Sequence, residues 1–393
     1  MKAPRSTWGL RAIICAVLAA AAFCGVSVER PQQAVGQERN FAGSLQVDYL
    51  LAPTELEARD SAFDGFTTEL ALKLAVDFND AVSSNVKVCY GCHGFELNFA
   101  FVDLRVADEL NFRVGRFNPA FGEFPLRHDP ANHRTSDKPL PYDMGRMLRL
   151  REWNMGIMPT PYTDNGLEVN GTHWFGDTVQ LDYAVWLAGG FRGGNDDVDL
   201  DWVQSHTPAF YYVDNNSRPA VGGRLALSLD LSNDATLTVG ASAQHGTYDP
   251  NNDLSYTILG AEAYLRLGRF DLRGEYLVRR TQMSLGDNPA ARFRYARADG
   301  VFEDYFLKDG FYLEANMPVG RIVEFVMRWD GLRRFGNVVN TSPLRSESWV
   351  LRYTAGVNFI LQRSIRLKLT GEFYDFSDFD DDVAVHTAIA AVY

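Results

Sequence analysis

The stretch Glu69-Leu70-Ala71-Leu72-Lys73-Leu74-Ala75-Val76-Asp77-Phe78 has an apolar side chain at every even position from 70 to 78. Successive side chains of a β-strand point to opposite faces, so this period of two predicts a strand with one apolar and one polar face. The same alternation returns at 225–231 and at 365–370. Soluble β-sandwiches alternate as well, so the pattern indicates an all-β fold without deciding its class.

The connections between the alternating segments decide the class, because tight turns and long connections follow one another along the chain. We predict sixteen strands, near 44–51, 67–78, 86–92, 95–106, 110–118, 166–175, 178–188, 219–231, 234–245, 254–268, 269–281, 310–319, 321–330, 348–361, 364–376 and 383–393. Tight turns such as Gly176-Asp177 and Ser232-Asn233 contrast with long connections such as 119–165 and 189–218. Short turns at one end and long loops at the other are typical of a closed antiparallel transmembrane β-barrel, which pairs every backbone group without exposing an edge to lipid.

The N-terminus predicts export. Lys2, Arg5 and Arg11 precede or begin an apolar stretch from 12 to 23, followed by small residues, which is the order found in a cleaved signal peptide. We therefore divide the chain into a signal peptide at 1–24, an N-terminal segment at 25–43 and a barrel at 44–393. After the signal, no run approaches the eighteen apolar residues of a membrane-spanning helix.

Charge and aromatic residues agree with this assignment. The formal net charge of −12 argues against nucleic acid as a partner and disfavours acidic partners. Trp186, Trp329 and Trp349 fall at the long-loop ends of their strands, where an interfacial aromatic girdle would place them, although ordinary core packing is the alternative.

The segment Phe112-Arg113-Val114-Gly115-Arg116-Phe117-Asn118-Pro119-Ala120-Phe121-Gly122 resembles the strand and loop opening of phosphate-selective and related sixteen-stranded bacterial porins, and the final residues ending in Tyr393 resemble the terminal strand of outer-membrane proteins. The resemblance implies a bacterial outer-membrane location, contact with the lipid bilayer and lipopolysaccharide, and a long loop, 119–165, folded into the lumen as a constriction. We also expect a homo-oligomer. With lysine only at 2, 73, 87, 138, 308 and 368, the lysine-based phosphate selectivity of that family is not expected.

One motif carries chemistry. Cys89-Tyr90-Gly91-Cys92-His93 is a CxxCH run, in which Cys89 and Cys92 would bind one haem c covalently and His93 would be an axial iron ligand. The alternatives are a reversible Cys89–Cys92 disulfide or two unmodified thiols with an incidental His93. A zinc site would need a fourth donor that the motif does not contain.

A second axial ligand for that haem is expected from loop 119–165. This loop contains His128 and His133, either of which is a candidate, together with Met144, Met147, Met155 and Met158. Arg127, Arg134 and Arg146 could pair with the haem propionates. Each residue has an ordinary alternative, since loop histidines are commonly solvated and methionines commonly fill gaps.

These features predict an outer-membrane barrel with one haem c that transfers electrons at or across the membrane. Because one haem cannot span a bilayer of about 30 Å, other c-type cytochromes would be its partners. The main alternative is a plain diffusion porin without a redox role, and a third is a haem-dependent peroxidase. No common catalytic motif is present, so we expect a carrier or channel rather than an enzyme. The acidic stretch 375–382 is expected to be a solvated outer loop. The alternatives are that it binds calcium or that cations bridge it to lipopolysaccharide.

Overall fold

The structure is a computed structural model in which residues 38–52, 65–91, 94–130, 132–143, 156–201, 205 and 213–393 are described. The predicted signal peptide, 1–24, lies outside these residues, as does all of the predicted 25–43 segment before Glu38. No described helix is long and apolar enough to cross a membrane.

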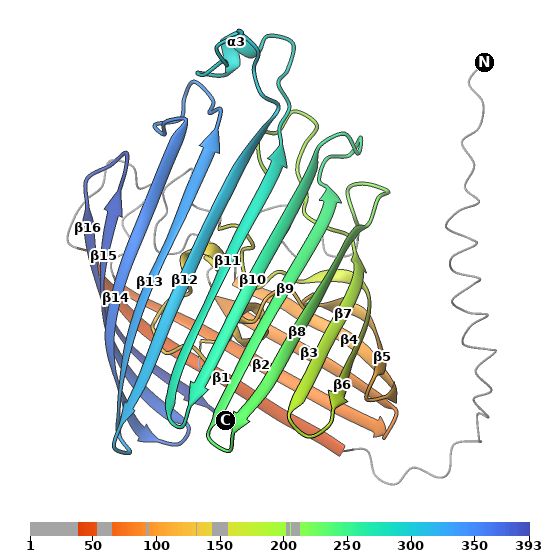
Figure 1. Cartoon of the computed structure of the whole chain (residues 1–393), viewed down its shortest axis with the longest axis vertical. Coiled ribbons are helices and arrows are strands. Elements are labelled where there is room, and N and C mark those ends of the chain that lie inside the picture. The colour runs from red at the N-terminus through yellow and green to blue at the C-terminus, as the bar shows by residue number, and fades with distance from the viewer. Residues whose placement is uncertain are drawn as a thin grey trace, which may run out of the picture. The chain divides into compact units, whose positions relative to one another are not determined.

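Sixteen strands form one closed antiparallel barrel, in which each strand pairs with the next along the chain (Figure 1). They are β1 Glu38–Leu51, β2 Gly65–Asn79, β3 Val82–Gly91, β4 Gly94–Ala107, β5 Leu110–Phe117, β6 Asp164–Phe175, β7 Val179–Ala188, β8 Ala220–Ser232, β9 Ala235–Thr247, β10 Ser255–Leu267, β11 Phe270–Gln282, β12 Tyr305–Val319, β13 Val323–Gly336, β14 Glu347–Gln362, β15 Ile365–Phe376 and β16 Asp382–Val392. Pairing of β1 with β16, from Ser44 opposite Val392 to Leu51 opposite Val385, closes the barrel. The predicted fold class is confirmed.

The alternation that predicted the strands has its apolar face on the outside. Leu225 and Leu369 are 60% and 40% exposed, whereas Lys368, next to Leu369, is fully buried inside the barrel. A soluble protein would bury its leucines and expose its lysines. The inverted arrangement is suited to a barrel that is surrounded by lipid and has a polar interior.

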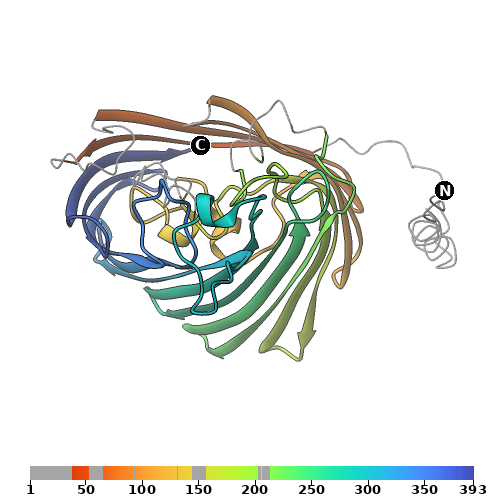
Figure 2. The ribbon, with the colours of Figure 1, turned by 90° about the horizontal axis from the view of Figure 1, so that it is seen from above.

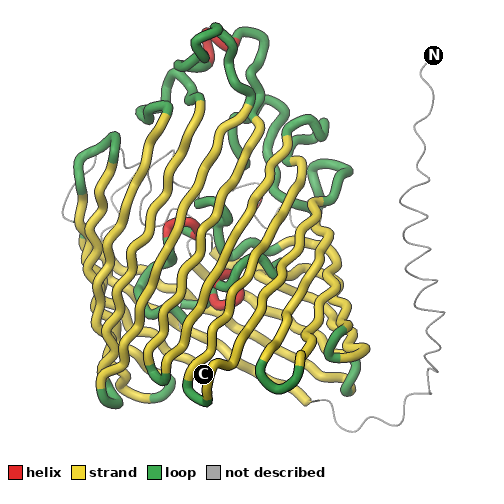
Figure 3. Tube along the Cα trace, viewed as in Figure 1, coloured by secondary structure: helices red, strands yellow, loops and turns green. Residues whose placement is uncertain are grey.

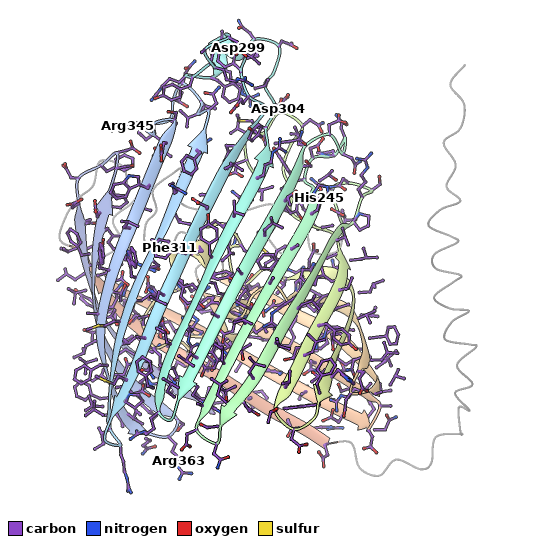
Figure 4. The ribbon with its side chains drawn as sticks, viewed as in Figure 1. His245, Asp299, Asp304, Phe311, Arg345 and Arg363 are labelled. Atoms are coloured by element: carbon purple, nitrogen blue, oxygen red, sulfur yellow. The ribbon has the colours of Figure 1, made fainter. Side chains whose placement is uncertain are left out.

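The connections separate into two ends (Figure 3). At one end the connections are short, such as 80–81, 233–234 and 363–364. At the other end they include 189–219, 283–304 and 337–346, and the β3–β4 link at 92–93 is a short exception. In Figure 4, Asp299, Asp304 and Arg345 lie toward the long-loop end and Arg363 at the short-turn end.

Residues 118–163, between β5 and β6, are called the constriction segment below. Its described parts contain two 3-10 turns, η1 Phe124–Arg127 and η2 Leu140–Tyr142. Figures 2 and 3 show both turns within the ring of strands, at about mid-height of the barrel. The described parts of the predicted inward loop, 119–165, therefore lie inside the barrel.

Several details differ from the expectations: β3 and β12 begin earlier, at Val82 and Tyr305, and β13 continues to Gly336. β1 begins at Glu38 rather than 44; Glu38, Arg39 and Asn40 are all polar, so the period of two is absent where the strand starts. Trp186 is fully buried and lies on the inner face of β7, packed against Gly222, so the girdle prediction is wrong for this residue. Trp329 is 45% exposed on the outer face, but it lies in the middle of β13 and not at the long-loop end where the girdle was predicted, because this strand continues to Gly336.

Candidate functional site

The constriction segment leaves the sheet because of its sequence. Pro119, Pro125, Pro130, Pro139 and Pro141 follow one another at short intervals. Proline has no backbone N–H to donate to a neighbouring strand, and it is tolerated in the first turn of a helix, where both 3-10 turns carry one. The segment therefore cannot extend β5, and it lies instead against the inner wall of the barrel.

The strongest attachment to the wall is Asp137. One of its carboxylate oxygens accepts a hydrogen bond from Arg328 of β13 at 2.7 Å, and the other accepts from Arg352 of β14. All three side chains are at most 3% exposed. Burial would raise the pKa of Asp137, but the charges of Arg352 and Arg328 outweigh burial and lower the pKa well below its ordinary value.

Asp330 of β13 extends this attachment. It accepts hydrogen bonds from Arg352 and from the backbone N–H of Leu140 at 2.8 Å, at the start of η2. Arg352 also donates to the carbonyl of Lys138 at 2.7 Å. A buried charge is tolerated only when it is paired and hydrogen-bonded, and these contacts meet that condition.

A second attachment uses a buried lysine. Lys368 of β15 donates to the carbonyls of Pro130 and Thr135 at 2.8 and 3.0 Å, and to the side chain of Gln46 of β1 at 2.8 Å. Gln46 in turn donates to the carbonyl of Ser136 at 2.9 Å. Carbonyl groups that proline-rich sequence leaves without a strand partner are thus satisfied by the barrel wall.

A third attachment surrounds Glu275 of β11. Its carboxylate accepts from the backbone N–H of Phe124 at 2.8 Å, and from the hydroxyls of Tyr142 and Tyr312 at 2.5 and 2.8 Å. Burial, together with the nearby charge of Glu275, raises the pKa of Tyr142 well above its ordinary value, so this hydroxyl stays a donor. The ring of Phe124 stacks on that of Tyr142 at 5.1 Å.

The fourth attachment joins the segment to β3, which carries the start of the CxxCH run. Lys87 forms an ion pair with Asp129 and a 3.0 Å hydrogen bond with Nε2 of His128. Nδ1 of His128 lies 2.7 Å from the carbonyl of Pro125, so this ring is a neutral tautomer that donates to Pro125 and accepts from Lys87. Burial and the charge of Lys87 lower the pKa of His128 to about 3.

The residues predicted to hold haem are only partly within the described chain. Cys89 lies on the same inner face of β3 as Lys87, whereas Cys92 and His93 lie outside the described residues. The β3–β4 link is at the long-loop end, as strand order predicted.

Both candidates for the second axial ligand form hydrogen bonds within the protein. Both ring nitrogens of His128 have partners, and Nε2 of His133 lies 2.8 Å from the carbonyl of His128. Met158 is buried in the hydrophobic core, and Met144, Met147 and Met155 lie outside the described residues. Among the described residues, no group of three His, Cys, Asp or Glu side chains could hold a metal ion. The assignment of His128 or His133 as a second haem ligand stays a prediction.

On the opposite wall of the lumen, the short-turn ends of the strands keep polar side chains in contact with water. Asp103, Arg113, Asn170, Thr172 and Asp182, on the inner faces of β4 to β7, are all partly exposed. By contrast, the charged residues of β13 to β15 that bind the constriction segment are at most 3% exposed; they are Arg328, Asp330, Arg352 and Lys368. The segment thus buries the inner side chains of β13 to β15 that it contacts, whereas polar side chains at the short-turn ends of β4 to β7 stay partly exposed.

The residues that hold the constriction were not identified from the sequence. Arg328 and Asp330 alternate with Met327 and Trp329, so their inward direction follows from the period of two. Which loop they would contact could not be read, because Arg328 and Asp137 are separated by 191 residues.

Solved outer-membrane proteins have the same architecture. OmpF of Salmonella typhi, in a complex with daunomycin, aligns with a TM-score of 0.57 at 12% identity over 91% of this chain and 98% of that chain. OprB of Pseudomonas putida aligns with a TM-score of 0.54 at 9% identity over 91% and 94% of the two chains. The outer membrane channel DcaP of Acinetobacter baumannii aligns with a TM-score of 0.52 at 11% identity over 92% and 99%. At these identities the likeness is one of fold.

No protein-family model matches the chain, and no curated protein matches it. The chain therefore has a porin-like sixteen-stranded fold, and its apolar outer surface is suited to the bacterial outer membrane in which its structural neighbours are found.

Proposed function

We propose that the chain is a diffusion porin, which lets small polar solutes cross the outer membrane through a passage narrowed by the constriction segment. The observation that supports this function is the asymmetry of the lumen. Buried ion pairs hold the segment on the wall formed by β13 to β15, and the inner faces of β4 to β7 keep polar side chains partly exposed at their short-turn ends. An enzyme needs a set of reactive groups facing a substrate, whereas a channel needs only this polar lining.

Single-channel recording in planar bilayers tests the proposal. Asn170 points into the lumen and the neighbouring Val169 points outward. We expect the wild-type barrel to conduct, Asn170→Trp to reduce its conductance, and Val169→Trp to leave the conductance unchanged, because only the first variant places a large ring in the passage. A correctly folded wild-type barrel that does not conduct would contradict the proposal.

The electron-transfer hypothesis is kept as a second candidate because Cys89 faces the lumen. A haem c, if attached through Cys89 and Cys92 with His93 as an iron ligand, would supply one-electron transfer. Expression with haem c maturation, followed by haem staining and intact mass, tests this candidate. A protein of unmodified mass would exclude electron transfer through haem, and partner cytochromes would then not be expected. The proposed porin function would be unaffected.

The proposed oligomer and lipopolysaccharide contacts concern the outer surface of the same barrel. One structural neighbour, OmpT of Vibrio cholerae, is described in a trimer form, at 9% identity and a TM-score of 0.52. Native mass spectrometry of the detergent-folded protein would show whether this chain assembles as well. A monomer across the concentration range would contradict the expected homo-oligomer.

A further inference from the structure

A cavity of about 380 Å³ lies at the short-turn end of the lumen, between the constriction segment and the β14–β15 hairpin. Five of its lining residues are arginines: Arg127 and Arg134 from the segment, Arg273 from β11, and Arg363 and Arg366 from the hairpin region. Its lining contains no carboxylate among the described residues. Arginines that line one small cavity repel one another unless anions neutralise them, and Arg363 is exposed at the turn.

Carboxylates behind the cavity neutralise only part of this charge. Glu123 lies 2.7 Å from Arg127 and 3.9 Å from Arg273, and Glu324 lies 3.3 Å from Arg366. Glu314 lies 3.8 Å from Arg273 and is shared with Arg328. Three carboxylates therefore face five arginines, which leaves an excess of about two positive charges at the cavity.

Arg134 and Arg363 account for the excess. Neither forms an ion pair with any carboxylate in the described part of the chain. The Arg134 carbonyl accepts a 2.9 Å hydrogen bond from Asn358, which fixes its backbone, and its buried Nε has no hydrogen-bond partner. A buried donor without a partner is costly, so a ligand that accepts its hydrogen bond is favoured.

We propose that this cavity is a binding subsite for small oxyanions, carboxylates or phosphates, on the short-turn side of the constriction. Guanidinium groups bind such anions through two parallel hydrogen bonds, and several arginines around one cavity can engage one anion together. The whole chain has a formal net charge of −12, but the cavity is locally positive. The inference rests on the proposed porin function, because the anion must enter the lumen.

Block of the channel by anions tests the subsite. The barrel is reconstituted in bilayers of zwitterionic lipid, so that no anionic headgroup competes, and succinate or inorganic phosphate is added to each side in turn. We expect either anion to block the current, more strongly from the short-turn side, and the reversal potential in a KCl gradient to indicate a preference for chloride. We expect Arg134→Gln and Arg363→Gln each to weaken the block about tenfold, because each removes a charge-assisted contact.

Arg105→Gln is the matched control. Arg105 lines a separate polar cavity near the short-turn end and is paired with Asp77 at 3.3 Å, so its loss removes one lumen charge without touching the proposed subsite. The control should retain the block. A wild-type barrel that conducts but is not blocked, or a control that loses the block as much as the two variants, would overturn the subsite and leave the porin function standing. A barrel that does not conduct would instead contradict the porin function.

Discussion

Replacing Asp137 with asparagine should detach part of the constriction segment from the barrel wall. The substitution keeps the size of the side chain and removes its charge, so Arg328 and Arg352 lose a buried carboxylate that accepts a hydrogen bond from each. Breaking a buried ion pair by removing one partner costs about 3–5 kcal/mol. Asp330 remains hydrogen-bonded to Arg352, and Glu372 lies 3.7 Å away, so the lower value, about 3 kcal/mol, is expected.

A loss of about 3 kcal/mol changes the equilibrium between the attached and detached segment roughly 100-fold. Hydrogen exchange of backbone amides reports this equilibrium directly. The Leu140 amide donates to Asp330 and the Tyr142 amide donates to the Pro139 carbonyl, so a peptide covering 132–143 is the region to follow. We expect its exchange to accelerate roughly 100-fold in Asp137→Asn, while the strand amides keep their protection.

Asp199→Asn is the control for this experiment. Asp199 lies in the β7–β8 connection and is paired with Arg279 of β11 at 3.0 Å, so the control also removes a carboxylate from an ion pair between a loop and the wall. It should leave peptide 132–143 protected. If Asp137→Asn accelerates exchange of this peptide by less than about threefold, the ion pairs do not hold the constriction and the reasoning is refuted.

Three further outcomes are expected. His128 stays neutral in the attached segment until about pH 3, whereas a solvated histidine binds a proton near pH 6.5, so attachment should weaken as pH falls from 6.5 towards 3. Hydrogen exchange of peptide 122–130 should accelerate over this range. In His128→Asn the histidine contribution to this pH dependence should be absent. Gly222→Ala should destabilise the barrel by about 1–3 kcal/mol, because the added Cβ would overlap Trp186. In Gly371→Ala the added Cβ meets open space, so this control should be neutral. Urea unfolding monitored by gel mobility compares the two variants, and equal stability would contradict the packing of Trp186 against Gly222. If haem c is attached, the double variant Cys89→Ala/Cys92→Ala should abolish the haem-stained band, and a band that persists would show that attachment does not use this motif.

The strands and their order could be predicted because they depend on local information. An alternation such as Leu225, Leu227 and Leu229 needs only neighbouring residues to specify a strand and its two faces. The even strand count and the alternation of short and long connections then imply a closed barrel, since lipid leaves no other way to pair the backbone. The resemblance around 112–122 further implied the inward loop, which the structure places inside the barrel.

Local sequence information led to a wrong prediction for Trp186. Trp186 was assigned to an outer girdle from its position near a strand end, but it has the same parity as Asp182 and Ala184, which face inward. Gly222 on the neighbouring strand supplies the space for its ring. Only the pairing of β7 with β8 brings these two residues together.

The sequence by itself determined that the chain is a sixteen-stranded barrel with an apolar exterior and a loop long enough to enter the lumen. The tertiary structure decided how that loop is held and where charge remains unpaired. The pairs of Asp137 with Arg352 and of Lys87 with His128 join residues from separate strands and the loop. The cavity around Arg134 combines residues of the loop with residues of β11 and β14 to β16. Such contacts depend on the tilt and closure of the whole barrel, a property of all sixteen strands together that no local pattern encodes.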